Sequence, residues 1–371
     1  MIGKLSLLVL GVFLILGATA CKGKIAYIGP DGNVWVVKPD GTNLTQITTD
    51  ATGTDYGLHD QYVLYEYPNS FWQRPIWSPD GSELAYFRTS GVGADTSTVE
   101  FFVTDFTGPP KKVHTIFIGR AGFDIVPTAW TADGQGIYFE ECIGGTIHMD
   151  FTCQIKLVLI ASGETSTLFT IEKGYSASIL NPSPNGKYLA WHKSYVEGVG
   201  NPCIFNLETR QNSCLNEFRG RSSWSPDGTK LAIDDCGYGC RRGALAIFNP
   251  EDWSSVPLLQ NTEKFGYERP VWSPTGDKIA YIMLDQTDLS VDPLHGTPSL
   301  WVINTNGTNP VKVADSLAGG RYAFSPDGKY LVYTKSAGPY PDKTAELWVT
   351  SVDASLSWKI ADGFQPVWSA N

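Results

Sequence analysis

The stretch "PIWSPDGSELAYF" (75–87) decides the fold, because an apolar strand, a tight turn and a second, alternating strand follow one another within it. Pro presets one torsion of such a turn, and Gly supplies the positive one. The pattern recurs at intervals of 42 to 53 residues, measured between Trp77 and its equivalents. The other copies are "TAWTADGQGIYFE" (128–140), "LNPSPNGKYLAWH" (180–192), "SSWSPDGTKLAID" (222–234), "PVWSPTGDKIAYI" (270–282) and "YAFSPDGKYLVYT" (322–334).

A second half-repeat follows each copy, as in "VEFFVTDFTG" (99–108) and "LWVINTNGTN" (300–309). It reads as two hydrophobic strands joined by a turn of Asn, Asp and Gly. Together the two halves predict a unit of four antiparallel strands, and the repeat length is that of one blade of a β-propeller.

The two ends of the repeat array predict how the ring closes. Residues 24–48 contain the second, third and fourth strands of a blade, and "GFQPVWSAN" (363–371) supplies the missing first strand. Such a strand, donated from one end to the other, removes the exposed sheet edges. We therefore predict an all-β, seven-bladed β-propeller of four-stranded antiparallel blades, forming a single domain over 21–371. Six or eight blades stay open as alternatives, since Pro182 stands where Trp is expected.

Composition supports this class and excludes others. The chain has 38 Gly and 23 Pro, which favour many short elements over a helical bundle. Its net charge of −10 would repel a phosphate backbone, so no nucleic acid is expected as a partner.

The W-S-P-D-G turn followed by an I-A-Y strand resembles the TolB-type propeller repeat, a WD-like unit also found in the propeller domains of prolyl-oligopeptidase-like enzymes. The resemblance covers nearly all of the chain after Cys21 and implies the same propeller fold.

The first twenty residues have the pattern of a signal peptide, with Lys4 before an apolar run at 5–16. The small residues at 17–20 that precede Cys21 resemble the bacterial lipobox, which implies cleavage before Cys21 and a diacylglycerol thioether on its sulfur. The alternatives are an uncleaved signal anchor or an ordinary cleavage. We expect the protein to be extracytoplasmic, attached to the cell envelope through lipid.

The six other cysteines fit an oxidising compartment. They fall in three close pairs, which we predict to be disulfides, and a turn at 208–209 would place the middle pair on facing strands. None of the pairs has C-x-x-C spacing, so no metal cluster is expected. The predicted disulfides are Cys142–Cys153, Cys203–Cys214 and Cys236–Cys240.

The recurring Trp and Asp residues are interpreted as blade packing and turn capping, so we look for function where the repeat is irregular. The longer connections lie on the face opposite the Pro-Asp-Gly turns. The segment 49–73 is rich in aromatic residues and includes His59, Tyr62 and Trp72, a composition typical of recognition surfaces. The alternative is a loop with a small core of its own.

Four arginines stand three residues before a Trp-equivalent position, where the inner strand leaves the long-loop face. In a closed ring they would converge on the channel mouth and could bind carboxylate or phosphate. The alternative is that each pairs with a local acid such as Glu268. The four are Arg74, Arg221, Arg269 and Arg321.

No catalytic or cofactor motif is present: the sequence lacks G-x-S-x-G and H-E-x-x-H, and its five histidines are scattered. We expect a non-catalytic, monomeric lipoprotein that binds an envelope protein or an anionic cell-wall glycan, without cofactor or metal. The alternative is a hydrolase or lyase for anionic oligosaccharides, with the four arginines binding substrate and His59 or His148 as general base.

Overall fold

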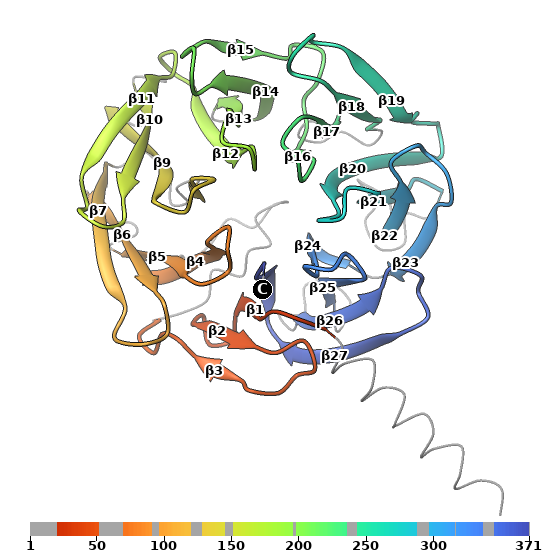
Figure 1. The fold of residues 1–371 in the computed structure, drawn as a ribbon, viewed down its shortest axis with the longest axis horizontal. Helices are drawn as coiled ribbons and strands as arrows, with labels where there is room; N and C mark the ends of the chain where they lie inside the picture. The colour runs from red at the N-terminus through yellow and green to blue at the C-terminus, as the bar shows by residue number, and fades with distance from the viewer. Residues whose placement is uncertain are drawn as a thin grey trace, which may run out of the picture.

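The computed structural model describes residues 21–51, 70–90, 96–119, 128–144, 151–195, 198–235, 243–287, 297–315, 317–336 and 345–370. Seven four-stranded antiparallel sheets stand side by side around a central axis (Figure 1). Blade 1 has the strand order β28-β1-β2-β3, and blades 2 to 7 each use four consecutive strands from β4 to β27. The seven-bladed all-β propeller expected from the repeat is confirmed. Among these residues, no helix has the length and apolar character needed to cross a bilayer.

The strands nearest the axis end at the Trp-equivalent position, and the second strands follow the Pro-Asp-Gly turns. The inner strands are β4 (Ser70–Trp77), β8 (Thr128–Trp130), β12 (Ser176–Pro182), β16 (Ser222–Trp224), β20 (Phe265–Trp272), β24 (Leu317–Phe324) and β28 (Phe364–Trp368). The second strands are β1 (Ile25–Ile28), β5 (Leu84–Ser90), β9 (Gly136–Gly144), β13 (Tyr188–Tyr195), β17 (Leu231–Asp234), β21 (Lys278–Asp285) and β25 (Tyr330–Ser336).

The second half-repeat forms the outer two strands of each blade. The third strands are β2 (Val34–Val37), β6 (Thr96–Thr104), β10 (Phe151–Leu159), β14 (Gly198–Asn206), β18 (Leu245–Phe248), β22 (Thr297–Asn304) and β26 (Ala345–Ser351). The outermost strands are β3 (Thr45–Gln46), β7 (Lys111–Gly119), β11 (Thr165–Thr170), β15 (Asn212–Cys214), β19 (Ser255–Leu259), β23 (Val311–Asp315) and β27 (Ser357–Asp362).

The alternation of strand directions gives the ring two different faces. The first strand of a blade meets the second, and the third meets the fourth, on one face, which we call the turn face. The connections from second to third strands, and from one blade to the next, lie on the opposite face, which we call the loop face. On the turn face, Asp80 accepts hydrogen bonds from the Ser78 hydroxyl (2.6 Å) and the Ser82 amide (3.0 Å), and these bonds lower its pKa. This aspartate therefore caps its own turn, as its repetition indicated.

Three of the repeated tryptophans, Trp77, Trp130 and Trp224, each join a blade to the one before it. The indole of Trp130 donates to the carbonyl of Ile76 (3.0 Å), and that of Trp224 donates to the carbonyl of Asn181 (2.8 Å). Both side chains are 5% exposed. The core consequently lies between blades, where Phe101 of blade 2 meets Phe139 of blade 3 edge-on, with ring centroids 5.2 Å apart.

The C-terminal strand closes the ring as predicted. β28 pairs with β1 in antiparallel register, with Ile25 opposite Trp368 and Ala26 opposite Val367. The amide of Ser369 donates to the carbonyl of Lys24 (2.8 Å), so the pairing continues past the end of β28. Blade 1 is therefore made from both ends of the described chain.

Two of the three predicted disulfides are confirmed. Cys142–Cys153 joins β9 to β10, with 4.0 Å between the Cα atoms, and Cys203–Cys214 joins β14 to β15, with 3.9 Å. The third pair, Cys236 and Cys240, lies outside the described residues. β9 continues to Gly144 and β10 begins at Phe151, with Cys142 opposite Cys153, so the first disulfide is a cross-strand bond.

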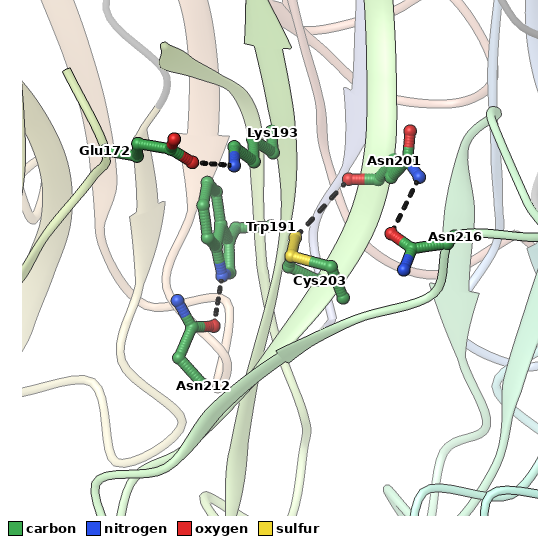
Figure 2. Close-up of a disulfide and its surroundings, with 8 residues drawn as sticks. Glu172, Trp191, Lys193, Asn201, Cys203, Asn212 and Asn216 are labelled. Atoms are coloured by element: carbon green, nitrogen blue, oxygen red, sulfur yellow. Dashed lines mark hydrogen bonds and ion pairs between the residues drawn. A yellow bond between two sulfur atoms is a disulfide. The ribbon is translucent and has the colours of Figure 1, made fainter.

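The second disulfide lies beside a buried tryptophan (Figure 2). The indole of Trp191 donates to Asn212 Oδ1 (2.9 Å), which lies two residues before Cys214 on the same edge strand. The short outer strand β15 is thus held to its blade by a covalent bond and a side-chain hydrogen bond.

Candidate functional site

The inner strands carry an irregularity where the predicted arginines stand. The pairing of β4 with β5 shifts register between Gln73 and Ile76, and the pairing of β20 with β21 shifts between Glu268 and Val271. Such bulges re-aim the side chains they contain. Each shift contains an Arg-Pro pair, and proline is tolerated because an inner strand has an edge without a ladder partner. Arg74 and Arg269 are therefore bulge residues rather than regular strand residues.

The backbone of Arg269 is held from two sides. Its φ of 57° lies in the left-handed region that residues other than glycine seldom adopt. The carboxylate of Asp234 accepts the Arg269 amide (2.5 Å), and the hydroxyl of Tyr322 donates to the Arg269 carbonyl. Gln365, at the same repeat position of β28, has a φ of 56°, so this conformation belongs to the repeat.

The guanidinium of Arg269 contacts a neighbouring acid. Its Nε lies 3.3 Å from Oε1 of Glu268, and both side chains are mostly buried. For this arginine, the alternative of local pairing is therefore correct.

Arg74 and Arg221 come from blades 2 and 5, on opposite sides of the ring, yet their charges interact. Arg74 is exposed to water at its place in the wall of the channel cavity. The surrounding protein removes part of its hydration, and this effect, followed by repulsion from Arg221, lowers the pKa of Arg74 to about 10. Arg74 and Arg221 stand at the same repeat position, three residues before Trp77 and Trp224.

Of the other predicted ligand-binding residues, the structure describes the side chain of Arg321 alone. Arg321 is half-buried on β24 of blade 7, within the register shift between Leu317 and Tyr322. His59 and Tyr62 lie outside the described residues, and Trp72 lies on β4 with only its backbone described. Arg74, Arg269 and Arg321 thus lie on inner strands of blades 2, 6 and 7, and Arg221 directly precedes the inner strand of blade 5.

A cavity of about 400 Å³ occupies part of the channel between Arg74 and the turn face. It draws its walls from blades 1, 2, 6 and 7, and Arg74 supplies a positive charge to it. Its lining includes Arg74, Trp77, Pro79, Pro274, Phe324 and Trp368. The space is comparable to that of small-ligand pockets.

Sequence reasoning missed a set of buried polar residues behind the arginines. The second strands of blades 2, 6 and 1 carry Phe87, Ile282 and Ile28 at one repeat position. Blades 3, 4 and 5 carry Glu140, His192 and Asp234 there, all no more than 5% exposed. This departure from apolar character was the signal that could have found them.

Each of these three residues reaches the inner strand of the next blade. Glu140 accepts the amide of Ala177, His192 Nε2 lies 3.2 Å from the hydroxyl of Ser222, and Asp234 accepts the amides of Arg221 (2.9 Å) and Arg269. A buried polar side chain therefore bridges each of three successive boundaries between blades, from blade 3 to blade 6.

Burial perturbs two of these groups strongly. It raises the pKa of Glu140 to about 8. It lowers the pKa of His192 to about 3, with a smaller contribution from the positive charge of Arg221. His192 is fully buried, so it stays neutral at pH 7 and has no access to a ligand in the channel.

One group of potential metal ligands occurs among the described residues: Glu140, Cys142 and Cys153. The two cysteines form a disulfide with each other, so their sulfurs are not available as thiolate ligands. This group is therefore not a metal site.

Proteins of known structure share the fold of this chain, whereas comparison of the sequence alone finds no relative. No protein-family model matches the sequence, and no curated protein matches it. TolB from Acinetobacter baumannii has a similar structure, with 16% identity and a TM-score of 0.51; the match covers 93% of this chain and 81% of that protein. An oligogalacturonate lyase in complex with manganese gives 12% identity and a TM-score of 0.58, covering 92% and 86%.

A structure from a study of two prolyl endopeptidases is similar at 13% identity with a TM-score of 0.62. The match covers 93% of this chain but only 49% of that enzyme, so this chain spans about half of the enzyme's length. The expected resemblance to the TolB-type propeller is thus confirmed for the fold. The two disulfides are compatible with an extracytoplasmic location.

Proposed function

We propose that this protein is a non-catalytic, extracytoplasmic propeller, lipid-anchored through Cys21, that binds an anionic oligosaccharide of the cell envelope through arginines in its channel. The observation that carries the proposal is the place of Arg74 in the wall of the channel cavity, with Arg221 at the same repeat position of blade 5. Guanidinium groups at equivalent positions of the ring favour a ligand with several carboxylates, because each group can pair with one of them.

The rigidity of the scaffold supports binding by positioned groups. Asp234 fixes the backbone of Arg221 and Arg269, and Tyr322 fixes the other side of Arg269. Groups held in place before the ligand arrives lose less entropy on binding. The similarity to oligogalacturonate lyase concerns the fold alone, but oligogalacturonate is an anionic oligosaccharide and is therefore a suitable probe.

A fluorescence titration with galacturonate oligomers tests the proposal. Trp77 and Trp368 line the cavity, so a ligand there should change the intrinsic emission. We expect Arg74→Gln and Arg221→Gln each to weaken binding by about tenfold or more, the worth of one charge-assisted contact. Lys230→Gln is the control, since it removes an exposed positive charge on the turn face. Equal affinity for all four proteins would overturn the proposal.

Chromatography of the oligomer after incubation tests the enzyme alternative. The proposal expects intact oligomer after prolonged incubation. Product that forms with the wild type, and is abolished by His59→Ala or His148→Ala, would replace the binding function with that of a hydrolase or lyase. A partner that proves to be an envelope protein, with no binding of the glycan, would also overturn it.

A further inference from the structure

The N-terminal residues after Cys21 are attached to the propeller without a free tether. The Lys22 carbonyl accepts the indole of Trp368 (2.8 Å), and the Lys24 amide donates to the Ser369 hydroxyl (2.8 Å). Gly23 between them has a φ of 88°, and a Cβ there would lie 2.9 Å from both Ser369 Oγ and Trp368 Nε1. The three residues that follow Cys21 are therefore packed on the closing strand.

The position of Cys21 relative to the two faces follows from its surroundings. It packs against the apolar cluster between blades 7 and 1. Its electrostatic neighbours are Asp327 and Asp40, and it is in turn a neighbour of Tyr330. Asp327 belongs to the Ser-Pro-Asp-Gly turn of blade 7, and Asp40 belongs to the turn between β2 and β3. Both turns lie on the turn face, so Cys21 does too.

From this geometry we infer that the turn face lies against a lipid surface and that the loop face, with the mouth of the channel, points away from it. The inference rests on the lipid anchor of the proposed function. A chain reaches at most about 3.4 Å per residue. Because residues 22 to 24 are bound to blade 1, they cannot extend as a linker between the lipid and the propeller. A lipid on Cys21 therefore holds this part of the turn face at the lipid headgroups.

Two observations agree with that placement. Lys22 and Lys24 are exposed beside Cys21, where basic side chains can contact lipid phosphates. Lys24 lies 4.4 Å from the ring centroid of Phe106, in a turn of blade 2, so the turns around the anchor lie on the same face. With the turn face covered, an oligosaccharide would reach the arginines from the loop face.

The test uses the full-length chain, produced in a bacterium that lipidates its exported proteins and reconstituted into phosphatidylcholine vesicles. A fluorophore is attached through an azide-bearing residue introduced at Lys329 on the turn face or at Glu263 on the loop face, both exposed. Lipids with a nitroxide on the headgroup quench nearby fluorophores. We expect quenching at position 329 to be at least threefold stronger than at position 263.

The matched control carries a Gly/Ser linker of about twenty residues between Cys21 and Lys22, which has a root-mean-square length of about 25 Å. We expect the linker to bring the two positions to nearly equal quenching. Mass spectrometry of the N-terminal peptide first establishes whether Cys21 carries the lipid. A peptide without lipid overturns the anchor, and the orientation with it. A lipidated protein quenched equally at both positions, or more at position 263, overturns the orientation alone.

Discussion

The carboxylate of Asp234 in blade 5 accepts the backbone amide of Arg269 in blade 6, across the seam between the two blades. Its other oxygen accepts the amide of Arg221 in its own blade (2.9 Å). One buried side chain therefore sets the relative position of the backbones of Arg221 and Arg269. It also binds the backbone of Arg269 in the left-handed conformation that Gln365 shares at the same repeat position.

Replacement of Asp234 tests this role. We expect Asp234→Ala to lower the free energy of unfolding by about 2–4 kcal/mol, because two buried amides lose a charged acceptor. We expect Asp234→Asn to retain part of that stability, since its carbonyl oxygen still accepts one bond. Urea unfolding measures the change. The control is Asp235→Ala, which removes the adjacent, exposed carboxylate. Equal losses in Asp234→Ala and Asp235→Ala would contradict the role.

Glu140 should give the stability a dependence on pH. Its pKa rises from an ordinary value of 4.5 to about 8 on folding. Between these values the folded protein keeps a proton that the unfolded chain has lost, so the contribution of Glu140 falls as pH rises from about 5 to 8. The slope approaches about 1.4 kcal/mol per pH unit.

Glu140→Gln should remove that slope, because an amide does not ionise while its oxygen can still accept the Ala177 amide. In urea unfolding at pH 5, 6.5 and 8, the free energy of unfolding of the variant should rise relative to that of the wild type as pH rises. Glu164→Gln, which removes an exposed carboxylate of the same blade, is the control. A constant difference between Glu140→Gln and the wild type at all three pH values would exclude the proposed titration.

The close approach at Gly23 gives a test of ring closure. We expect Gly23→Ala to cost about 1–3 kcal/mol, because the new methyl group would meet Ser369 and Trp368 and the positive φ is strained for alanine. Gly108→Ala is the matched control, since a Cβ there meets nothing within 4 Å. If both variants unfold at the same urea concentration, the residues after Cys21 do not contribute to closure as described.

The disulfide of blade 4 should contribute measurable stability. The double variant Cys203→Ser with Cys214→Ser is expected to lose about 3 kcal/mol, as the chain-entropy model gives for a loop of this size. Peptide mapping without reductant would verify Cys142–Cys153 and Cys203–Cys214 and would test the remaining prediction, Cys236–Cys240. An unchanged midpoint of unfolding would show that the bond between β14 and β15 does not restrict the unfolded chain.

The blades were predictable because their signals are local: Trp77 ends an inner strand, and the following turn is set by Pro79, Asp80 and Gly81. Ring closure was predictable because a missing first strand at one end matched an extra one at the other. The spacing also put Arg74 and Arg269 at one repeat position, and both lie in a register shift of their inner strands. The bonds from Asp234 and Tyr322 to Arg269 could not be predicted, because they depend on how neighbouring blades meet, and the repeat pattern does not encode that angle.

Two ligands that differ only in charge test whether the arginines of the channel bind an anion. Isothermal titration would measure binding of a galacturonate oligomer and of the same oligomer with its carboxylates methyl-esterified. Both have the same sugar backbone, but only the first can pair with Arg74 and Arg221. We expect esterification to weaken binding by about tenfold or more and Arg221→Gln to remove most of this difference. Equal affinity for the two oligomers, or no binding of the acidic one, would contradict the proposed function.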